Sequence, residues 1–213
     1  MTDILPFLKS LLSIPGLSGS ESPAARLIER EWCPLVDELS LSRLGSIHGL
    51  KKGVGESPRP SIMLAAHMDA IGLMVSQIEG GFLRITSVGG VDPRVLPGQA
   101  VIVHTEKEDL PGVVVIPPPK LLPPRASDGA VDISHLFVDV GLLPSKVASL
   151  VRIGDLVSFG MEAVEMPGEI VSSPSLDNRA SVAAVTLCLQ ELRSKSHTWD
   201  VWAAATVQEE IDY

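Results

Sequence analysis

The spacing of apolar residues along the chain predicts helices near the N-terminus. Residues 4–12 and 24–32 carry apolar side chains at helical spacing, and Ser22 followed by Pro23 is typical of a helix start. Residues 36–41 then alternate between apolar and polar, as a half-buried strand does. Residues 45–51 are the expected hairpin partner of that strand.

Two nearly continuous apolar runs, residues 61–66 and 201–207, predict strands that are buried on both faces. A helix is expected over residues 177–193, because Val182, Val185 and Leu189 fall on one helical face. Both ends of the chain therefore favour an α/β domain.

The middle of the chain has a different pattern, with short strand-like segments separated by turn residues such as Gly89 and Gly90. This spacing is typical of a small all-β unit. The expected strands are residues 72–77, 82–88, 99–104, 112–116, 136–140 and 155–159. We therefore predict a β domain at residues 71–165, inserted into an α/β domain made of residues 1–70 and 166–213.

Composition narrows the possible functions. The 213 residues carry a formal net charge of −9 without a cluster of Lys or Arg, which argues against a nucleic-acid partner. No apolar run reaches the roughly 18 residues that a membrane-spanning helix needs. Cys33 and Cys188 lie far apart and are expected to be free, buried thiols. With no signal-peptide pattern at the first residues, a cytoplasmic location is expected.

His67 and Asp69 directly follow the predicted strand 61–66. Open α/β sheets bind ligands at the carboxyl ends of their strands. There, His67 could give one imidazole nitrogen to a metal ion while Asp69 holds the other nitrogen. The alternative is a hydrogen-bonded surface histidine without a ligand.

Three more carboxylates stand at α/β junctions. Asp177 opens a predicted helix and could bridge metal ions, or act only as a helix N-cap. Glu209 and Glu210 follow the predicted strand 201–207. Since neighbours in an extended chain point to different sides, one could bind a metal ion and the other serve as general base. The alternative is a solvated acidic turn.

The order of these residues, with a β insert between the first pair and the rest, forms a wider pattern. The segments that carry it are residues 15–21, 66–72, 89–98, 137–141, 153–155, 176–179 and 207–210. Together they resemble the dinuclear metallo-aminopeptidases of clan MH. The pattern is most similar to the tetrahedral-assembly family of glutamyl and deblocking aminopeptidases, some of which have carried an endoglucanase name.

The resemblance implies a role for each residue. His67, Asp177 and Glu210 would bind a divalent metal, zinc or cobalt, with Glu209 as general base and Asp69 as the residue that orients His67. It also implies peptide substrates, from which N-terminal residues are removed. The β insert would be barrel-like and would serve self-association, with no nucleic-acid or membrane partner.

The chain also differs from the family pattern after the Glu-Glu pair. Members of the family continue after the Glu-Glu pair with a glycine-rich turn and two further metal ligands, an Asp and a His, whereas here only Ile211, Asp212 and Tyr213 follow. We therefore expect a C-terminally truncated, incomplete catalytic domain that binds at most one ion and is inactive or impaired. The alternative is a non-catalytic remnant that acts as an assembly or interaction module. A polysaccharide hydrolase is disfavoured, since aromatic residues make up only 4% of the chain.

Overall fold

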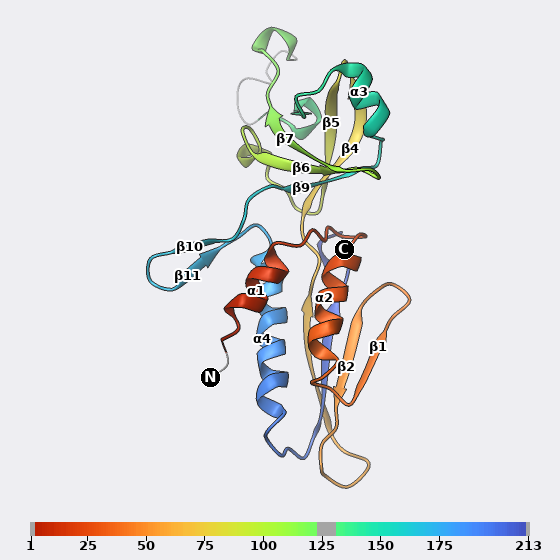
Figure 1. The fold of residues 1–213 in the computed structure, drawn as a ribbon, viewed down its shortest axis with the longest axis vertical. Helices are drawn as coiled ribbons and strands as arrows, with labels where there is room; N and C mark the ends of the chain where they lie inside the picture. The colour runs from red at the N-terminus through yellow and green to blue at the C-terminus, as the bar shows by residue number, and fades with distance from the viewer. Residues whose placement is uncertain (1–2, 123–130, 212–213) are drawn as a thin grey trace. The chain divides into compact units, whose positions relative to one another are not determined.

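The computed structural model describes residues 3–122 and 131–211, and the chain divides into two compact units. One unit is Met1–Ala70 with Glu162–Tyr213, and the other is Ile71–Met161. The helices and strands (Figure 1) are α1 (Leu5–Leu12), α2 (Ser22–Trp32), β1 (Glu38–Leu41), β2 (Ile47–Lys51), β3 (Ser61–His67), β4 (Gly72–Glu79), β5 (Phe82–Val88), β6 (Ala100–His104), β7 (Asp109–Val115), β8 (Phe137–Asp139), α3 (Pro144–Leu150), β9 (Leu156–Phe159), β10 (Val164–Met166), β11 (Ile170–Ser172), α4 (Leu176–Leu192) and β12 (Asp200–Thr206). Short 3₁₀ turns lie at Pro93–Val95, Pro119–Leu121, Ile133–His135 and Glu209–Ile211.

The first unit is built on a sheet with strand order β1-β2-β12-β3. Strand β12 pairs antiparallel with β2 and parallel with β3, so the sheet is mixed. Helices α1, α2 and α4 lie along this sheet in Figure 1. Their apolar sides form one core with the sheet, in which Trp32 and Leu189 pack with Ala203 and Ala205. An α/β packing of this kind is what the helical periodicity near both chain ends predicted.

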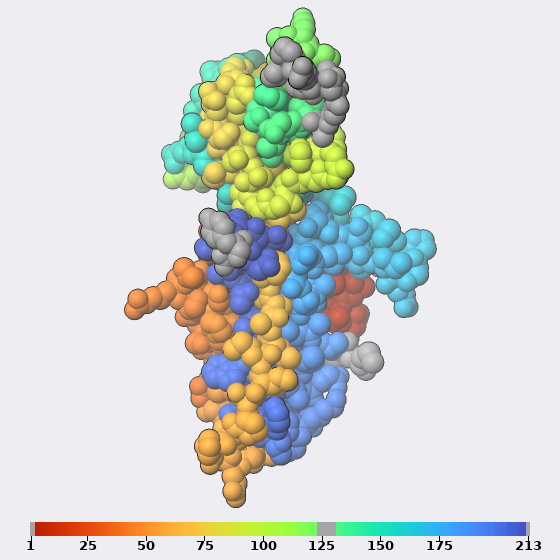
Figure 2. Space-filling model, turned by 180° about the vertical axis from the view of Figure 1, so that it is seen from behind, coloured from red at the N-terminus to blue at the C-terminus, as the bar shows by residue number. Residues whose placement is uncertain are grey.

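Strand β3 is less buried than its apolar sequence predicts. It stands at one end of the strand order, and Ile62 and Met63 are 47% and 59% exposed. Figure 2 shows the strand from behind as an exposed gold column. The expectation of burial on both faces was therefore wrong for β3 in the described residues. It holds for the central strand β12, where Ala203, Ala204 and Ala205 are all buried.

The two cysteines also differ from expectation. Both are free in the part of the chain that the structure describes, as predicted, but both are exposed rather than buried. Cys33 lies just after α2, and Cys188 lies on the exposed side of α4, next to the buried Leu189. Because apolar residues precede and follow Cys188 in the sequence, the sequence did not show that Cys188 lies on the solvent-exposed face of α4.

The second unit is a closed antiparallel barrel with strand order β4-β5-β8-β7-β6-β9. Its own apolar core includes Leu73, Leu83, Val103, Val138 and Val157. The barrel confirms the predicted barrel-like insert. The short helix α3, which the sequence did not predict, contributes Val147 and Leu150 to the same core. Among residues 3–122 and 131–211, no helix combines the length and the apolar character needed to cross a bilayer.

Candidate metal-binding site

The candidate site lies where strands β3 and β12 end. The two strands are parallel and in register, with His67 opposite Thr206, so their carboxyl ends meet at one edge of the sheet. The pairing continues one residue further, since the Met68 amide donates to the Thr206 carbonyl at 2.9 Å. The residues that follow β12 therefore fold directly beside His67, although more than 140 positions of sequence separate them.

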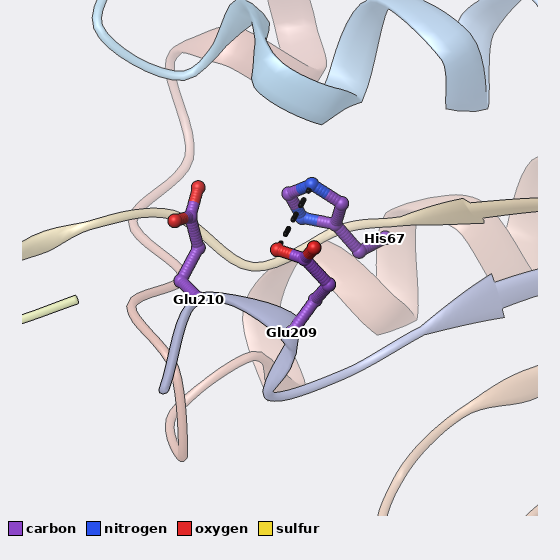
Figure 3. A group of neighbouring side chains, drawn as sticks. All are labelled: His67, Glu209 and Glu210. Atoms are coloured by element: carbon purple, nitrogen blue, oxygen red, sulfur yellow. Dashed lines mark ion pairs between the residues drawn. The ribbon is translucent and has the colours of Figure 1, made fainter. Parts of the chain in front are cut away.

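The two ring nitrogens of His67 face different groups. Nε2 lies 3.3 Å from Oδ1 of Asp177 and 3.5 Å from Oε2 of Glu209, and the latter pair is drawn in Figure 3. Nδ1 lies 3.4 Å from Oδ1 of Asp69. His67 is 7% exposed, so the environment of its ring is set by these carboxylates. One nitrogen thus faces a completely buried Asp69, and the other faces two carboxylates that are open to solvent.

A set of three side chains has the spacing of metal ligands. His67, Glu209 and Glu210 each offer a ligand atom, and these atoms lie within 4.8 Å of one another. Asp177 is outside this set, although it is 3.3 Å from Nε2 of His67 and its side chain is 86% exposed. The structure therefore brings together all the residues that the sequence singled out, with Glu209 rather than Asp177 in the tightest group.

Glu209 and Glu210 do not sit in extended chain, so the expected opposite orientation of neighbours was wrong. Gln208 has a positive φ of 62°, and Glu209–Ile211 form a 3₁₀ turn. This turn brings both carboxylates near His67 (Figure 3). Non-glycine residues seldom adopt positive φ, and such residues are found preferentially at functional sites.

Asp177 is not part of a regular helix turn. Both Asp177 and Asn178 have non-helical backbone angles within α4, with φ −83° and ψ 108° at Asp177. Ser175, the residue just before α4, makes no side-chain cap hydrogen bond. The carboxylate of Asp177 faces His67, with Oδ1 at 3.3 Å from Nε2.

The residues present fit a divalent cation. Nδ1 of His67 and Oδ1 of Asp69 are buried, and neither has a hydrogen-bond partner among the described residues. Burial raises the pKa of Glu210, His67 opposes this shift, and the charges of Glu209, Asp69 and Asp177 add to it. Carboxylates that repel one another around an imidazole would gain from a shared cation. Mixed nitrogen and oxygen donors suit zinc and related divalent ions.

Arg179 supports the site, although the sequence analysis gave it no role. The side chain is completely buried and donates to the carbonyls of Met68 at 3.0 Å, Leu11 at 2.6 Å and Ile14 at 2.6 Å. Burial lowers its pKa to about 10, opposed by Asp69, so it remains cationic at neutral pH. Arg179 thereby fixes the chain just after His67. Its place two residues after Asp177 was the signal that could have identified it.

Comparison with known proteins gives consistent matches. The family model for M42 glutamyl aminopeptidase matches residues 45–213. The lysyl aminopeptidase of Pyrococcus furiosus is 34% identical over 96% of this chain and 59% of its own length. The aminopeptidase APDkam598 of Desulfurococcus kamchatkensis has a TM-score of 0.88 at 33% identity, over 98% of this chain and 56% of that one.

A second solved structure is the TET1 peptidase of Pyrococcus horikoshii, which can assemble into a tetrahedron or a large octahedral shell. It matches with a TM-score of 0.83 and 32% identity, over 98% of this chain and 62% of its own. For each of these relatives the match covers only part of the other protein, and for the lysyl aminopeptidase this part is 59% of its length.

Proposed function

This chain belongs to the M42 glutamyl aminopeptidase family, and on that premise we propose that its site serves the metal-dependent removal of N-terminal residues from peptides. The observation that carries the proposal is the position of His67, whose Nε2 faces Asp177 and Glu209 while Nδ1 faces Asp69. A histidine held between an orienting carboxylate and further carboxylates is a common arrangement around a catalytic metal.

In this proposal His67, Asp177 and Glu210 would hold a divalent ion, zinc or cobalt. A bound ion of this kind lowers the pKa of water and polarises a carbonyl oxygen. Glu209 is 60% exposed and free to accept a proton from the attacking water and to return it to the leaving amine. Asp69 would hold Nδ1 of His67 and so keep Nε2 available.

The residues that the structure describes supply ligands for one ion at this edge of the sheet. We therefore propose that a polypeptide of these residues alone binds one ion and hydrolyses aminoacyl substrates weakly. A cytoplasmic location is part of the proposal, and two free, exposed cysteines are compatible with a reducing compartment.

Self-association through residues 71–165 is the second part of the proposal. The barrel carries an apolar groove whose lining includes Phe82, Ile116 and Leu121, which are 43%, 44% and 69% exposed. Exposed apolar surface of this kind favours association. The assembly of the TET1 peptidase adds support from a relative.

The proposal is tested by loading the chain with zinc or cobalt and measuring hydrolysis of aminoacyl chromogenic substrates. We expect weak turnover that a chelator removes, and a Glu209→Gln variant that keeps the metal but loses turnover. Turnover that survives chelation would contradict the metal-dependent mechanism. Complete inactivity of the metal-loaded chain in an oligomeric state would favour the alternative, a non-catalytic assembly or interaction module.

A further inference from the structure

The loop between α1 and α2 lies against the candidate site, although the proposed function gives it no role. Leu17 forms a parallel bridge with Ala70. Across this bridge the Ala70 amide donates to the Gly16 carbonyl at 3.0 Å, and the Ser18 amide donates to the Ala70 carbonyl at 3.3 Å. The loop is therefore fixed to the chain three residues after His67.

Two polar side chains of this loop are buried, Ser18 at 6% exposure and Glu21 at 5%. The Ser18 hydroxyl donates to Oδ2 of Asp69 at 2.5 Å. Oε1 of Glu21 accepts from the Gly19 amide at 2.8 Å and from the Gln208 amide at 3.1 Å. A buried carboxylate is costly unless its hydrogen bonds are made, so Glu21 strongly favours the conformation that supplies both amides.

These bonds fix the acidic turn from both sides. Glu21 holds the amide of Gln208, the residue with positive φ just before Glu209. On the other side, Oδ2 of Asp69 accepts from the Glu210 amide at 3.0 Å. Because Ser18 and Glu210 both donate to Oδ2, the other oxygen, Oδ1, is left to face His67 at 3.4 Å.

We propose that Glu21 and Ser18 are positioning residues of the metal-binding site. Glu21 sets the turn that carries Glu209 and Glu210, and Ser18 sets the orientation of Asp69 and through it of His67. This inference rests on the proposed function for its role in metal binding. The positioning itself is a property of the metal-free chain and can be measured separately.

The experiment compares Glu21→Ala, Glu21→Gln and Ser18→Ala with the unaltered 213-residue chain. Zinc affinity is measured by calorimetry, and amide hydrogen exchange at Gln208 and Glu210 is measured without metal. Thr186→Val is the matched control, since Thr186 is also buried and hydrogen-bonded, and its partners among the described residues are Trp32 and Val182. This control separates loss of positioning from loss of stability.

We expect Glu21→Ala to weaken zinc binding by about 10- to 100-fold, the usual effect of removing a group that supports a metal ligand. Glu21→Gln keeps an acceptor oxygen and should retain most of the affinity. Ser18→Ala should weaken binding less than Glu21→Ala does. Exchange at Gln208 should speed up in Glu21→Ala, and Thr186→Val should change neither exchange at Gln208 nor zinc affinity when compared at equal folded fraction.

Two results would overturn the inference. One is zinc affinity in Glu21→Ala within twofold of the unaltered chain, and the other is unchanged exchange at Gln208. If Glu21→Ala does not fold, Ser18→Ala provides the comparison, and zinc affinity in Ser18→Ala within twofold of the unaltered chain would then overturn the inference. If the unaltered chain binds no zinc while exchange at Gln208 still responds to Glu21→Ala, the proposed function fails but the positioning stands.

Discussion

The backbone amide of Glu210 donates a hydrogen bond to Oδ2 of Asp69 at 3.0 Å, across 141 positions of sequence. The other oxygen of the same carboxylate lies 3.4 Å from Nδ1 of His67. One buried Asp therefore touches both the histidine and the backbone of a proposed metal ligand. Any change at Asp69 is expected to reach the site through both contacts.

Replacing Asp69 by Asn should test this double contact. Asn keeps the size of the side chain but removes the charge that faces His67. We expect zinc affinity to fall by about 10- to 100-fold, as is usual when the group behind a metal-binding histidine is altered. Calorimetry would measure this change. Asp155→Asn, a matched change in the barrel at a carboxylate that bonds the Arg152 amide, should leave zinc affinity unaltered. Equal affinity in both variants would refute the role of Asp69.

Glu210 should make the metal-free chain less stable as pH rises. Burial raises its pKa above the ordinary value of 4.5, so the folded state binds this proton more tightly than the unfolded state does. Its contribution to the free energy of unfolding is therefore present below about pH 4.5 and is lost as the pH rises through the raised pKa. Glu210→Gln should then be more stable than the unaltered chain at pH 7, and the difference should shrink at pH 4.

Urea unfolding in the presence of a chelator measures this effect. The same variant should bind zinc more weakly, because a proposed ligand has been lost. Lower stability of Glu210→Gln at pH 7 without metal would show that the carboxylate is not under electrostatic strain.

The free energy of unfolding should depend on the hydroxyl of Thr186, which joins α4 to Trp32 of α2. Nε1 of the fully buried Trp32 donates to Oγ1 of Thr186 at 2.8 Å. Thr186→Val keeps the shape but leaves this donor without a partner, which costs about 1–3 kcal/mol in the free energy of unfolding. Chemical unfolding followed by tryptophan fluorescence would measure the loss. Thr186→Ser keeps the hydroxyl and should restore most of the stability, and an equal loss in both variants would contradict this account.

If the chain self-associates through the apolar groove of the barrel, placing a charged side chain in that groove should lower the molecular mass of the particles in solution. Leu121→Asp places a charge in the apolar groove and should shift the chain toward monomers, as measured by light scattering at micromolar concentration. Leu143→Asp is the control, because Leu143 is 76% exposed and is not among the residues that line the groove. A monomeric unaltered chain, or equal effects of the two variants, would argue against this interface.

Much of the fold follows from local patterns in the sequence. The six barrel strands were predicted from short strand-like segments separated by turn residues, β1 from its alternation of apolar and polar residues, and β2 as its hairpin partner. Strand order is not a local property, so the sequence could not show that β3 ends the described sheet. For the same reason Ile62 and Met63 were expected to be buried, and they are exposed.

The candidate site was partly accessible from sequence. His67 and Glu209 could be singled out because both directly follow apolar strands, and parallel pairing then brings them together. The contacts of Glu21 could not be found in this way, since its partner Gln208 lies 187 positions away and bonds through its backbone. The turn at Gln208 also escaped prediction, because no glycine marks its positive φ.

The most direct test of the central claim is a calorimetric titration of the metal-free chain with zinc, performed alongside His67→Ala. We expect saturable binding of one zinc ion per chain and loss of that binding in His67→Ala. An unaltered chain that takes up no zinc, or a His67→Ala variant that binds zinc with unchanged stoichiometry and affinity, would contradict a metal-binding site at His67.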